Sequence, residues 1–375
     1  MAPTKQRLLG ALLGVHAGDS FGAAHEFDSW YTIQKNFPPN GNIPRAITGG
    51  GPFKWSPGHA TDDTDNTRAV LLAYSEVVVK ATADKEQYGT EPTDTFLSIS
   101  QTAGKHMLQW YSGPWPGRPD RSRPKDVGGA TSAGLTLFAR AARQDPRKAG
   151  AGPGRCGNGS LMRCIPTALF ARDHERLVQE TALISAITHN DWRCILACVA
   201  YNVMVREMVY NDVTPDTAVS KALEVLADPE TSDTIVAALT VGSAAPDTST
   251  YDANRAEVEA AIEKCRGPDF DVGVLANVGP QKAELKDGEK ALPLAGNGYV
   301  LESLSLAVGA LLDTKRSWED LIVDVVRVGR DTDTNGAIAG GLVGARDGLD
   351  AIPAEWRAKL QFRDEFTKLV DQICG

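Results

Sequence analysis

The chain has 375 residues, with 39 Lys and Arg against 48 Asp and Glu, so its formal net charge is −9. This acidic excess argues against a protein whose main partner is the phosphate backbone of duplex nucleic acid. Apolar residues make up 42% of the chain, which is ordinary globular usage, and no apolar run approaches the roughly 18 residues that a membrane-spanning helix needs.

The first predicted element is an N-terminal helix. Leu8 to Ala17 is apolar, follows two basic residues and has helical periodicity. A short signal peptide has a similar pattern, but cleavage there would cut into Gly18-Asp19-Ser20, which looks like a functional turn. The six cysteines form no CxxC pair, which favours reduced thiols. We therefore expect a cytoplasmic protein, with the nucleus or mitochondria as alternatives.

Helical periodicity continues along the rest of the chain, and strand-like alternation is almost absent. These patterns predict an all-α fold. Turn-rich connectors separate the helices, and we expect Trp110 and Trp115 to lie in a surface loop. The predicted helices are Val70 to Val78, Ala130 to Arg143, Leu177 to Ile187, Arg193 to Tyr210, Thr217 to Leu226, Tyr251 to Cys265, Leu301 to Leu312, Trp318 to Val328, Ala337 to Ala345 and Ala354 to Ile373. The predicted connectors are Phe37 to Gly58, Tyr88 to Thr93, Gly113 to Gly129, Asp145 to Gly159 and Gly242 to Thr250.

Two similar acidic motifs lie near opposite ends of the chain. Thr61-Asp62-Asp63-Thr64-Asp65 precedes a helix that we expect to begin near Asn66. Asp331-Thr332-Asp333-Thr334-Asn335 precedes a small-residue helix from Gly336 to Ala345. Either motif alone is typical of a helix N-cap, because Asp and Thr side chains accept hydrogen bonds from free backbone N–H groups.

The presence of two such motifs favours a metal site. The carboxylates of Asp62, Asp63, Asp331 and Asp333 would repel one another strongly at a few ångströms, so a cluster of all four needs cations. Carboxylate and hydroxyl oxygens suit Mg²⁺, Ca²⁺ or Mn²⁺ better than zinc, and two divalent ions balance four negative charges. We expect a binuclear site inside a single domain that spans residues 1–375, because motifs from both ends must meet.

The ordered set of motifs resembles the ADP-ribosylglycohydrolases, which include the dinitrogenase reductase activating glycohydrolase and the ADP-ribosyl-arginine and ADP-ribosyl-serine hydrolases. The resemblance runs from Leu9 to Trp356. The matching segments are Gly10 to Gly14, Gly18 to Gly22 with Glu26, Gly50 to Phe53 with Pro57-Gly58, Thr61 to Thr64, Gly157 to Arg163 with Pro166, Thr188-His189, Gly298 to Val300 and Asp331 to Thr334.

The resemblance implies a compact orthogonal helical bundle with a central cleft that holds two Mg²⁺ or Mn²⁺ ions. It implies that Glu26 lies beside the metals and transfers a proton, with Asp62 or Asp63 as alternative catalytic residues. A metal-gating role for Glu26 is the alternative that the resemblance leaves open. Without the resemblance, an acid in this context is most often a surface residue. The metal ligands implied by the matching positions are Thr61, Asp62, Asp63, Asp331, Asp333 and Thr334.

Two glycine-rich turns are candidates for binding the substrate. Gly157-Asn158-Gly159-Ser160 offers unhindered backbone N–H groups and a helix N-terminus, a combination that suits a phosphate; an ordinary turn and cap is the alternative. Gly128, in the turn from Asp126 to Thr131, is a second candidate for lining the ribose or the phosphates.

Four further residues are candidate substrate contacts. His189 stands where the family keeps a ligand-contacting histidine, although a lone histidine at a helix end is otherwise a common structural hydrogen-bonder. Gly298 precedes Tyr299, whose ring would stack on adenine or pack into the core. Arg330 stands where the family commonly has glycine, and it would bind an anionic leaving group such as a phosphate.

The sequence therefore predicts metal-dependent hydrolysis of an ADP-ribosyl C1″ linkage, which releases ADP-ribose from protein arginine or serine or from a small conjugate. The alternatives are ADP-ribose-1″-phosphate processing or another two-metal nucleotide phosphoesterase, and a non-catalytic ADP-ribose-binding or crystallin-like protein. The expected partner is an ADP-ribose-containing small molecule or an ADP-ribosylated protein. We expect a monomer that binds neither duplex nucleic acid nor a membrane.

Overall fold

The computed structural model describes residues 4–88, 96–119, 122–279 and 298–375. These residues form α-helices and short 3-10 helices without any strand, which confirms the all-α prediction. The predicted connector from Tyr88 to Thr93 lies outside the described residues, apart from Tyr88 itself. In the described ranges, none of the helices has the length and apolar character needed to cross a membrane, and all six cysteines are free thiols.

The helices of the first half are α1 (Lys5–Gly22), α2 (Trp30–Asn36), α3 (Asp62–Tyr88), α4 (Phe96–Ser112), α5 (Gly129–Arg140), α6 (Ile165–Phe170), α7 (His174–Ala186) and α8 (Trp192–Asn211). Those of the second half are α9 (Pro215–Ala227), α10 (Pro229–Leu239), α11 (Tyr251–Cys265), α12 (Val272–Val278), α13 (Val300–Leu312), α14 (Trp318–Arg327), α15 (Thr332–Asp347), α16 (Ala354–Arg357) and α17 (Arg363–Cys374). The short 3-10 helices are η1 (Ala142–Gln144), η2 (Pro146–Lys148), η3 (Asn158–Arg163) and η4 (Leu349–Ala351).

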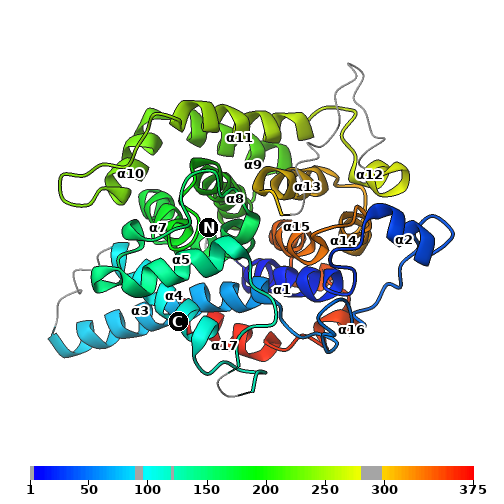
Figure 1. Ribbon diagram of the computed structural model, residues 1–375, viewed down its shortest axis with the longest axis horizontal. Coiled ribbons are helices and arrows are strands. Elements are labelled where there is room, and N and C mark those ends of the chain that lie inside the picture. Colours follow the sequence, from blue (N-terminus) through cyan, green and yellow to red (C-terminus); the bar gives the residue numbers. More distant parts are fainter. Residues whose placement is uncertain (1–3, 89–95, 120–121, 280–297) are drawn as a thin grey trace.

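Helices α1 and α15 lie side by side in the middle of the molecule (Figure 1). Glycines on both helices face one another, so the two backbones touch. A Cβ added at Gly18 would lie 1.9 Å from the carbonyl oxygen of Gly336, and one at Gly10 would lie 2.4 Å from that of Gly344. This contact accounts for several of the 36 glycines in the chain. It also joins a helix near the start of the sequence to one near its end.

The first acidic motif is inside a helix rather than before it. We expected α3 to begin near Asn66, but it begins at Asp62, so the acids occupy its first turn. The cap comes from another helix: the Oδ2 atom of buried Asp19 accepts hydrogen bonds from the backbone N–H of Thr61 (3.1 Å) and of Thr64 (3.2 Å). Because Asp19 satisfies these N–H groups, the carboxylates of Asp62 and Asp63 remain available for another role.

The second motif shows the same shift. Helix α15 begins at Thr332 rather than Gly336. The Thr332 hydroxyl donates to the carbonyl oxygen of Gly22 (2.7 Å), which ties this motif to the end of α1. Both motifs therefore form first helical turns, anchored by residues of α1.

The surface-loop prediction for Trp110 and Trp115 is wrong. Trp110 lies in α4, which we did not predict, and Trp115 lies just beyond it; both indoles are buried. Both indole N–H groups donate to the buried carboxylate of Asp65, at 3.0 and 2.7 Å. A carboxylate that accepts these bonds can stay inside the protein, because each buried polar group has a partner.

The predicted C-terminal helix from Ala354 to Ile373 is two helices, α16 and α17. The chain between them turns so that the backbone N–H of Gln361 donates to Gly58 (3.0 Å), and the Gln361 side chain accepts from Ala60 (3.1 Å). These contacts with the segment before α3 compensate for the interrupted helix. Such a break has no local sequence signal, because neither glycine nor proline marks it.

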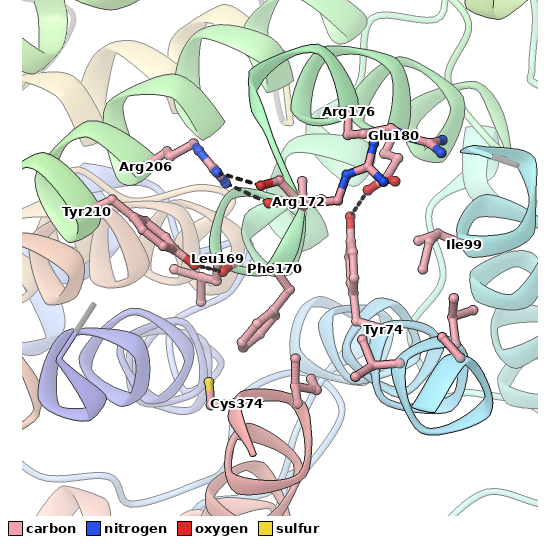
Figure 2. A pocket seen from close by; sticks show the side chains of 15 residues that line it. Tyr74, Ile99, Leu169, Phe170, Arg172, Arg176, Glu180, Arg206, Tyr210 and Cys374 are labelled. Atoms are coloured by element: carbon pink, nitrogen blue, oxygen red, sulfur yellow. Dashed lines mark hydrogen bonds between the residues drawn. The ribbon is translucent and has the colours of Figure 1, made fainter. Parts of the chain in front are cut away.

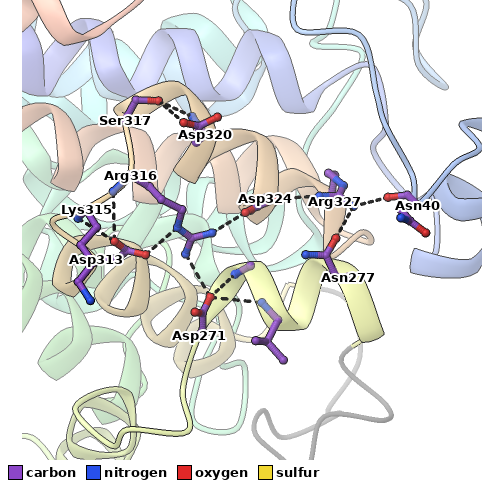
Figure 3. Close-up of polar contacts among 12 residues, drawn as sticks. Asn40, Asp271, Asn277, Asp313, Lys315, Arg316, Ser317, Asp320, Asp324 and Arg327 are labelled. Carbon is purple, nitrogen blue, oxygen red and sulfur yellow. Dashed lines mark hydrogen bonds and ion pairs between the residues drawn. The ribbon is translucent and has the colours of Figure 1, made fainter.

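A network of ion pairs fixes α14, the helix that leads into the second acidic motif (Figure 3). Arg316 donates to Asp313 (2.6 Å), to Asp324 (2.6 Å) and to Asp271 at the start of α12 (3.1 Å). Arg327 donates to Asp324 (2.9 Å), to Asn277 on α12 (2.9 Å) and to the backbone of Gly41 (3.0 Å). Since single exposed ion pairs contribute little, the shared carboxylate of Asp324 is the important feature.

Candidate active site

A cluster of carboxylates forms where α1, α3 and α15 meet. One carboxylate oxygen each of Glu26, Asp126 and Asp333 lies within 4.8 Å of the others. Asp62 shares a side-chain hydrogen bond with Asp126, and Asp63 lies beside Glu26 and Asp333. The structure thus brings together acids from both sequence motifs, as the metal-site hypothesis requires.

The pKa values in the cluster show how costly its negative charges are. Burial, together with the negative charges of Asp126 and Asp331, raises the pKa of Glu26 to about 9. Burial first, and then neighbouring carboxylates, also hold the pKa values of Asp62, Asp63 and Asp333 well above the usual range. Without cations these acids would retain protons at neutral pH.

The unpartnered oxygens of the cluster fit bound cations. Glu26 Oε2, Asp63 Oδ1 and Asp333 Oδ1 are buried and have no hydrogen-bond partner in the part of the chain that the structure describes. A buried carboxylate oxygen without a partner is costly, and hard divalent cations prefer such ligands. The hydroxyls of Thr61 and Thr334 both donate to Asp63 Oδ2 (3.3 and 3.2 Å), so the predicted neutral ligands lie beside the acids.

Asp126 is the cluster residue that sequence reasoning did not select. It stands in the loop before Gly128, a candidate substrate contact, and burial raises its pKa to about 6. Its neighbours in the sequence are not acidic, so no spacing pattern marked it. The available signal was its position, an acid directly before a glycine-rich turn that opens helix α5.

The glycine-rich turn at residues 157–160 connects to the second acidic motif. Helix η3 begins at Asn158, close to the expected helix start at Ser160. The Asn158 amide donates to Asp331 (2.8 Å) and to Ser303 (3.0 Å), and the Asn158 backbone N–H donates to Gly298 (2.9 Å). Asn158 therefore orients a predicted metal ligand.

His189 is neutral and held by a buried chain of hydrogen bonds. Arg163 Nη2 donates to the Thr188 hydroxyl (2.6 Å), and that hydroxyl lies 2.8 Å from His189 Nδ1. Burial, with a smaller contribution from the charge of Arg163, lowers the pKa of His189 to about 3. In the tautomer in which the Thr188 hydroxyl donates to Nδ1, the His189 proton is on Nε2. Sequence reasoning gave Arg163 no role of its own.

These groups line a cleft of about 330 Å³, a size that suits a small ligand. The candidate residues in its wall are Glu26, Asp62, Gly128, Gly157, Asn158, Gly159, His189, Gly298, Asp331, Asp333 and Thr334. Thr61, Asp63 and Ser160 are buried behind this wall. Tyr299 is also outside it: the residue pairs with Gly157 through its backbone, and its ring is half-buried beside Arg193.

Arg330 is not in the cleft wall either. Its backbone joins the two sides of the site, because its N–H donates to Asp28 (2.5 Å) and its carbonyl accepts from Phe27 (2.7 Å). The residue has φ of 73°, in the left-handed region that favours glycine. This backbone conformation gives a physical reason for the glycine that the family commonly has where this chain has Arg330. The pKa of Glu302 is raised to about 7, because the effect of burial is larger than the opposing effect of the Arg330 charge.

The ADP-ribosylglycohydrolase family model matches residues 1–375. The chain belongs to the ADP-ribosylglycohydrolase family. It is 25% identical, over 96% of its own length and 92% of the relative's, to the ADP-ribosyl-(dinitrogen reductase) glycohydrolase of Rhodospirillum rubrum. It is 23% identical to the ADP-ribosylarginine hydrolase Tri1 of Pseudomonas putida (strain GB-1), over 98% of this chain and 77% of that one.

A solved structure shares the fold of this ADP-ribosylglycohydrolase. It is described as an ADP-ribosylglycohydrolase-related protein complex, with a TM-score of 0.60 and 26% identity over 98% of this chain and 96% of that one. Membership in the family agrees with the resemblance that the ordered motifs carry. It gives the acidic cleft a chemical context, the hydrolysis of ADP-ribosyl linkages.

Proposed function

We propose that this ADP-ribosylglycohydrolase cleaves the C1″ linkage of ADP-ribosylated arginine with the help of two Mg²⁺ or Mn²⁺ ions. The observation that carries the proposal is the buried carboxylate cluster, which combines unpartnered oxygens with raised pKa values at the wall of a small cleft. Structural acids are normally paired with donors, whereas one oxygen each of Glu26, Asp63 and Asp333 has no donor among the described residues.

The cations would be held by the two acidic motifs, with Asp126 as an added ligand. Asp62 and Asp63 on α3, Asp331 directly before α15 and Asp333 in its first turn supply four carboxylates. The raised pKa values of Asp62, Asp63 and Asp333 would fall when a cation replaces the protons. When bound, such ions act as Lewis acids that hold hydroxyl groups and lower the pKa of water. Mg²⁺ and Mn²⁺ fit this all-oxygen ligand set better than zinc.

Glu26 is the proposed proton carrier. Its carboxyl group lines the cleft, and its Oε2 has no hydrogen-bond partner. In the reaction, the C1″–N bond breaks and a C1″–O bond to water forms. Glu26 would accept the proton from that water and deliver it to the departing guanidino nitrogen.

The remaining part of the cleft suits the ADP-ribose. Gly157, Gly159 and Gly128 present backbone with no side chain in the way, and the Nε2–H of neutral His189 would donate to a phosphate or a ribose hydroxyl. A Cβ at Gly159 would lie 2.9 Å from the His189 ring, so the wall needs glycine there.

The choice of arginine over other linkages rests on charge. Besides the metal motifs, Glu26 and Asp126 add acids to the cleft wall. Among the described residues that line it, the only titratable base is the neutral His189. Such a wall favours a cationic guanidinium leaving group over an anionic phosphate. Two relatives are named for hydrolysis at arginine or at dinitrogen reductase. Because Arg330 is outside the wall, the phosphate alternative loses its main support.

A substrate panel tests the proposal. Purified protein would be incubated with Mg²⁺ and ADP-ribosylated arginine, ADP-ribosylated serine or ADP-ribose-1″-phosphate, and released ADP-ribose would be measured. We expect the arginine conjugate to be hydrolysed fastest. Turnover only of the phosphate ester would favour the phosphoesterase, and no turnover of any substrate would favour the non-catalytic alternative.

A variant separates metal chemistry from fold. Asp333→Asn keeps the shape of the side chain but removes a charge from the cluster, so cation affinity and hydrolysis should both fall by at least about 100-fold. Asp247→Asn is the matched control, because Asp247 lies on an exposed loop that does not contribute to the catalytic cleft. Full activity of the Asp333 variant would exclude its role as a ligand.

A further inference from the structure

Phe27 lines the catalytic cleft directly after Glu26, and the reaction described above gives it no role. Its side chain is 54% exposed, the largest fraction among the exposed large apolar side chains of the described residues. A single exposed apolar residue is common on protein surfaces, so exposure alone assigns nothing to Phe27. Its fixed position in the cleft wall is the informative feature.

The backbone holds Phe27 in this position at a conformational cost. Its φ is 65°, in the left-handed region that bulky residues rarely adopt. The Phe27 N–H donates to the carbonyl oxygen of Arg330 (2.7 Å), and the carbonyl oxygen of Asp28 accepts from the Arg330 N–H (2.5 Å). Strain of this kind persists only where the surrounding structure imposes it, and it is concentrated at functional sites.

Neighbouring rings restrict the orientation of the Phe27 side chain. Phe53 meets it edge to face, with 6.1 Å between the ring centroids and 68° between the ring planes. Phe53 is half-buried and packs in turn near Trp55, with 5.9 Å between their centroids. An edge-to-face contact uses at most one face of a ring, so the Phe27 ring keeps a face for another partner.

Other aromatic rings of this protein are covered by its own arginines. The guanidinium carbon of Arg206 lies 4.7 Å from the centroid of the Tyr210 ring (Figure 2), and that of Arg68 lies 4.5 Å from the Trp115 ring. In the described part of the chain, no cation lies over the Phe27 ring. Phe27 therefore offers a ligand the type of surface that the protein's own guanidinium groups cover elsewhere.

The chemistry at Glu26 indicates which part of a substrate lies beside this ring. Consecutive Cα atoms are about 3.8 Å apart, so Phe27 adjoins the residue that we propose delivers a proton to the departing nitrogen. The adenine is at the other end of ADP-ribose, beyond the diphosphate. The leaving group is therefore the part of the substrate within reach of Phe27.

We propose that Phe27 determines specificity for arginine by stacking its ring on the guanidinium of the leaving group. The inference rests on the proposed function. The acids Glu26 and Asp126 in the same wall attract a positive charge, and the negative face of an aromatic ring accepts a flat guanidinium. A serine hydroxyl and a phosphate lack the planar cation, so this contact discriminates against both.

The contact is tested with two inhibitors on the full chain with Mg²⁺. Free arginine and citrulline have the same length, but the ureido group of citrulline is uncharged. Each would be titrated as an inhibitor of the hydrolysis of ADP-ribosylated arginine, and the ratio of the two inhibition constants is the arginine preference. We expect the unsubstituted protein to bind arginine more tightly than citrulline.

Variants assign this preference to the ring. Phe27→Leu keeps an apolar side chain without a ring face, so the arginine preference should fall by about 5–30-fold, which corresponds to about 1–2 kcal/mol for a partly desolvated cation–π contact. Phe27→Tyr keeps the ring face and should keep the preference within about twofold. Tyr31→Leu is the matched control, because Tyr31 on α2 is 51% exposed and outside the cleft wall; its preference should be unchanged.

The affinity for ADP-ribose, measured by calorimetry, separates the leaving-group contact from the rest of the cleft. It should stay within about twofold in every variant; a loss confined to Phe27→Leu would place ADP-ribose itself on the ring and overturn the proposal. Equal arginine preference in Phe27→Leu and Tyr31→Leu, or no preference in the unsubstituted protein, would also overturn it. If the unsubstituted protein does not hydrolyse ADP-ribosylated arginine, the proposed function fails instead, and direct titration of arginine and citrulline still tests Phe27.

Discussion

Substitution of Gly18 by alanine should affect catalysis more than stability. The added Cβ would lie 1.9 Å from the carbonyl oxygen of Gly336, and it must recede by about 1.4 Å to reach an acceptable C···O distance of about 3.3 Å. The obstacle is backbone, which cannot rotate away as a side chain can. Helices α1 and α15 must therefore move apart at the turn after Asp333.

The magnitude of both effects follows from this geometry. Overpacking costs about 3 kcal/mol, and the better helix propensity of alanine returns about 1 kcal/mol, so unfolding should become easier by about 2 kcal/mol. For 375 residues, with an unfolding entropy of about 2.1 cal/mol/K per residue, that corresponds to a Tm lower by about 2–3 °C. Displacement of the second acidic motif by about 1 Å should lower kcat/KM by about 100-fold.

Gly10→Ala is the control within the same pair of helices. Its Cβ would lie 2.4 Å from the carbonyl oxygen of Gly344, but the contact is about 12 Å farther along the helix from the acids. We expect a similar loss of Tm and less than a tenfold loss of activity. Calorimetry would give Tm and Mg²⁺ affinity, and hydrolysis of ADP-ribosylated arginine would give kcat/KM. Equal activity losses for the two variants at equal Tm, or full activity of Gly18→Ala, would refute the reasoning.

Three further outcomes follow from the site. Burial raises the folded-state pKa of Glu26 to about 9 and that of Asp126 to about 6, so the protein takes up protons when it folds without cations. The Tm in EDTA should therefore fall from pH 6 to 9, and Mg²⁺ should reduce this fall. A Tm that rises with pH in EDTA would contradict the assignment. Arg330→Gly should relieve about 1–2 kcal/mol of left-handed strain, an effect partly offset by the freer unfolded chain. The variant should hydrolyse the arginine conjugate at a rate within about twofold of the unsubstituted protein. A large loss of activity on any substrate would instead indicate a binding role for this residue. Asn158→Ala removes the donor to Asp331 and should weaken Mg²⁺ binding by about 10–100-fold in a calorimetric titration, whereas unchanged affinity would show that the amide does not orient the ligand.

Periodicity and composition located most of the long helices. Helix α11 has the predicted bounds, and α13 differs by one residue, because an amphipathic stripe is a local signal. Helix α4 was not predicted, because Pro and Trp residues that suggested a loop lie at its end and directly after it. Trp110 in α4 and Trp115 just beyond it can be buried because Asp65, on α3, provides the acceptor for their N–H groups.

The sequence by itself determined the family, the all-α class and two acidic motifs with matching composition. Only the tertiary structure decided which groups meet those motifs. Asp19 caps α3 from another helix, Asp126 joins the carboxylates from a loop, and the backbone of Arg330 links the two sides of the cleft. Each of these contacts joins residues far apart in the chain, and such contacts arise from packing that no local pattern encodes.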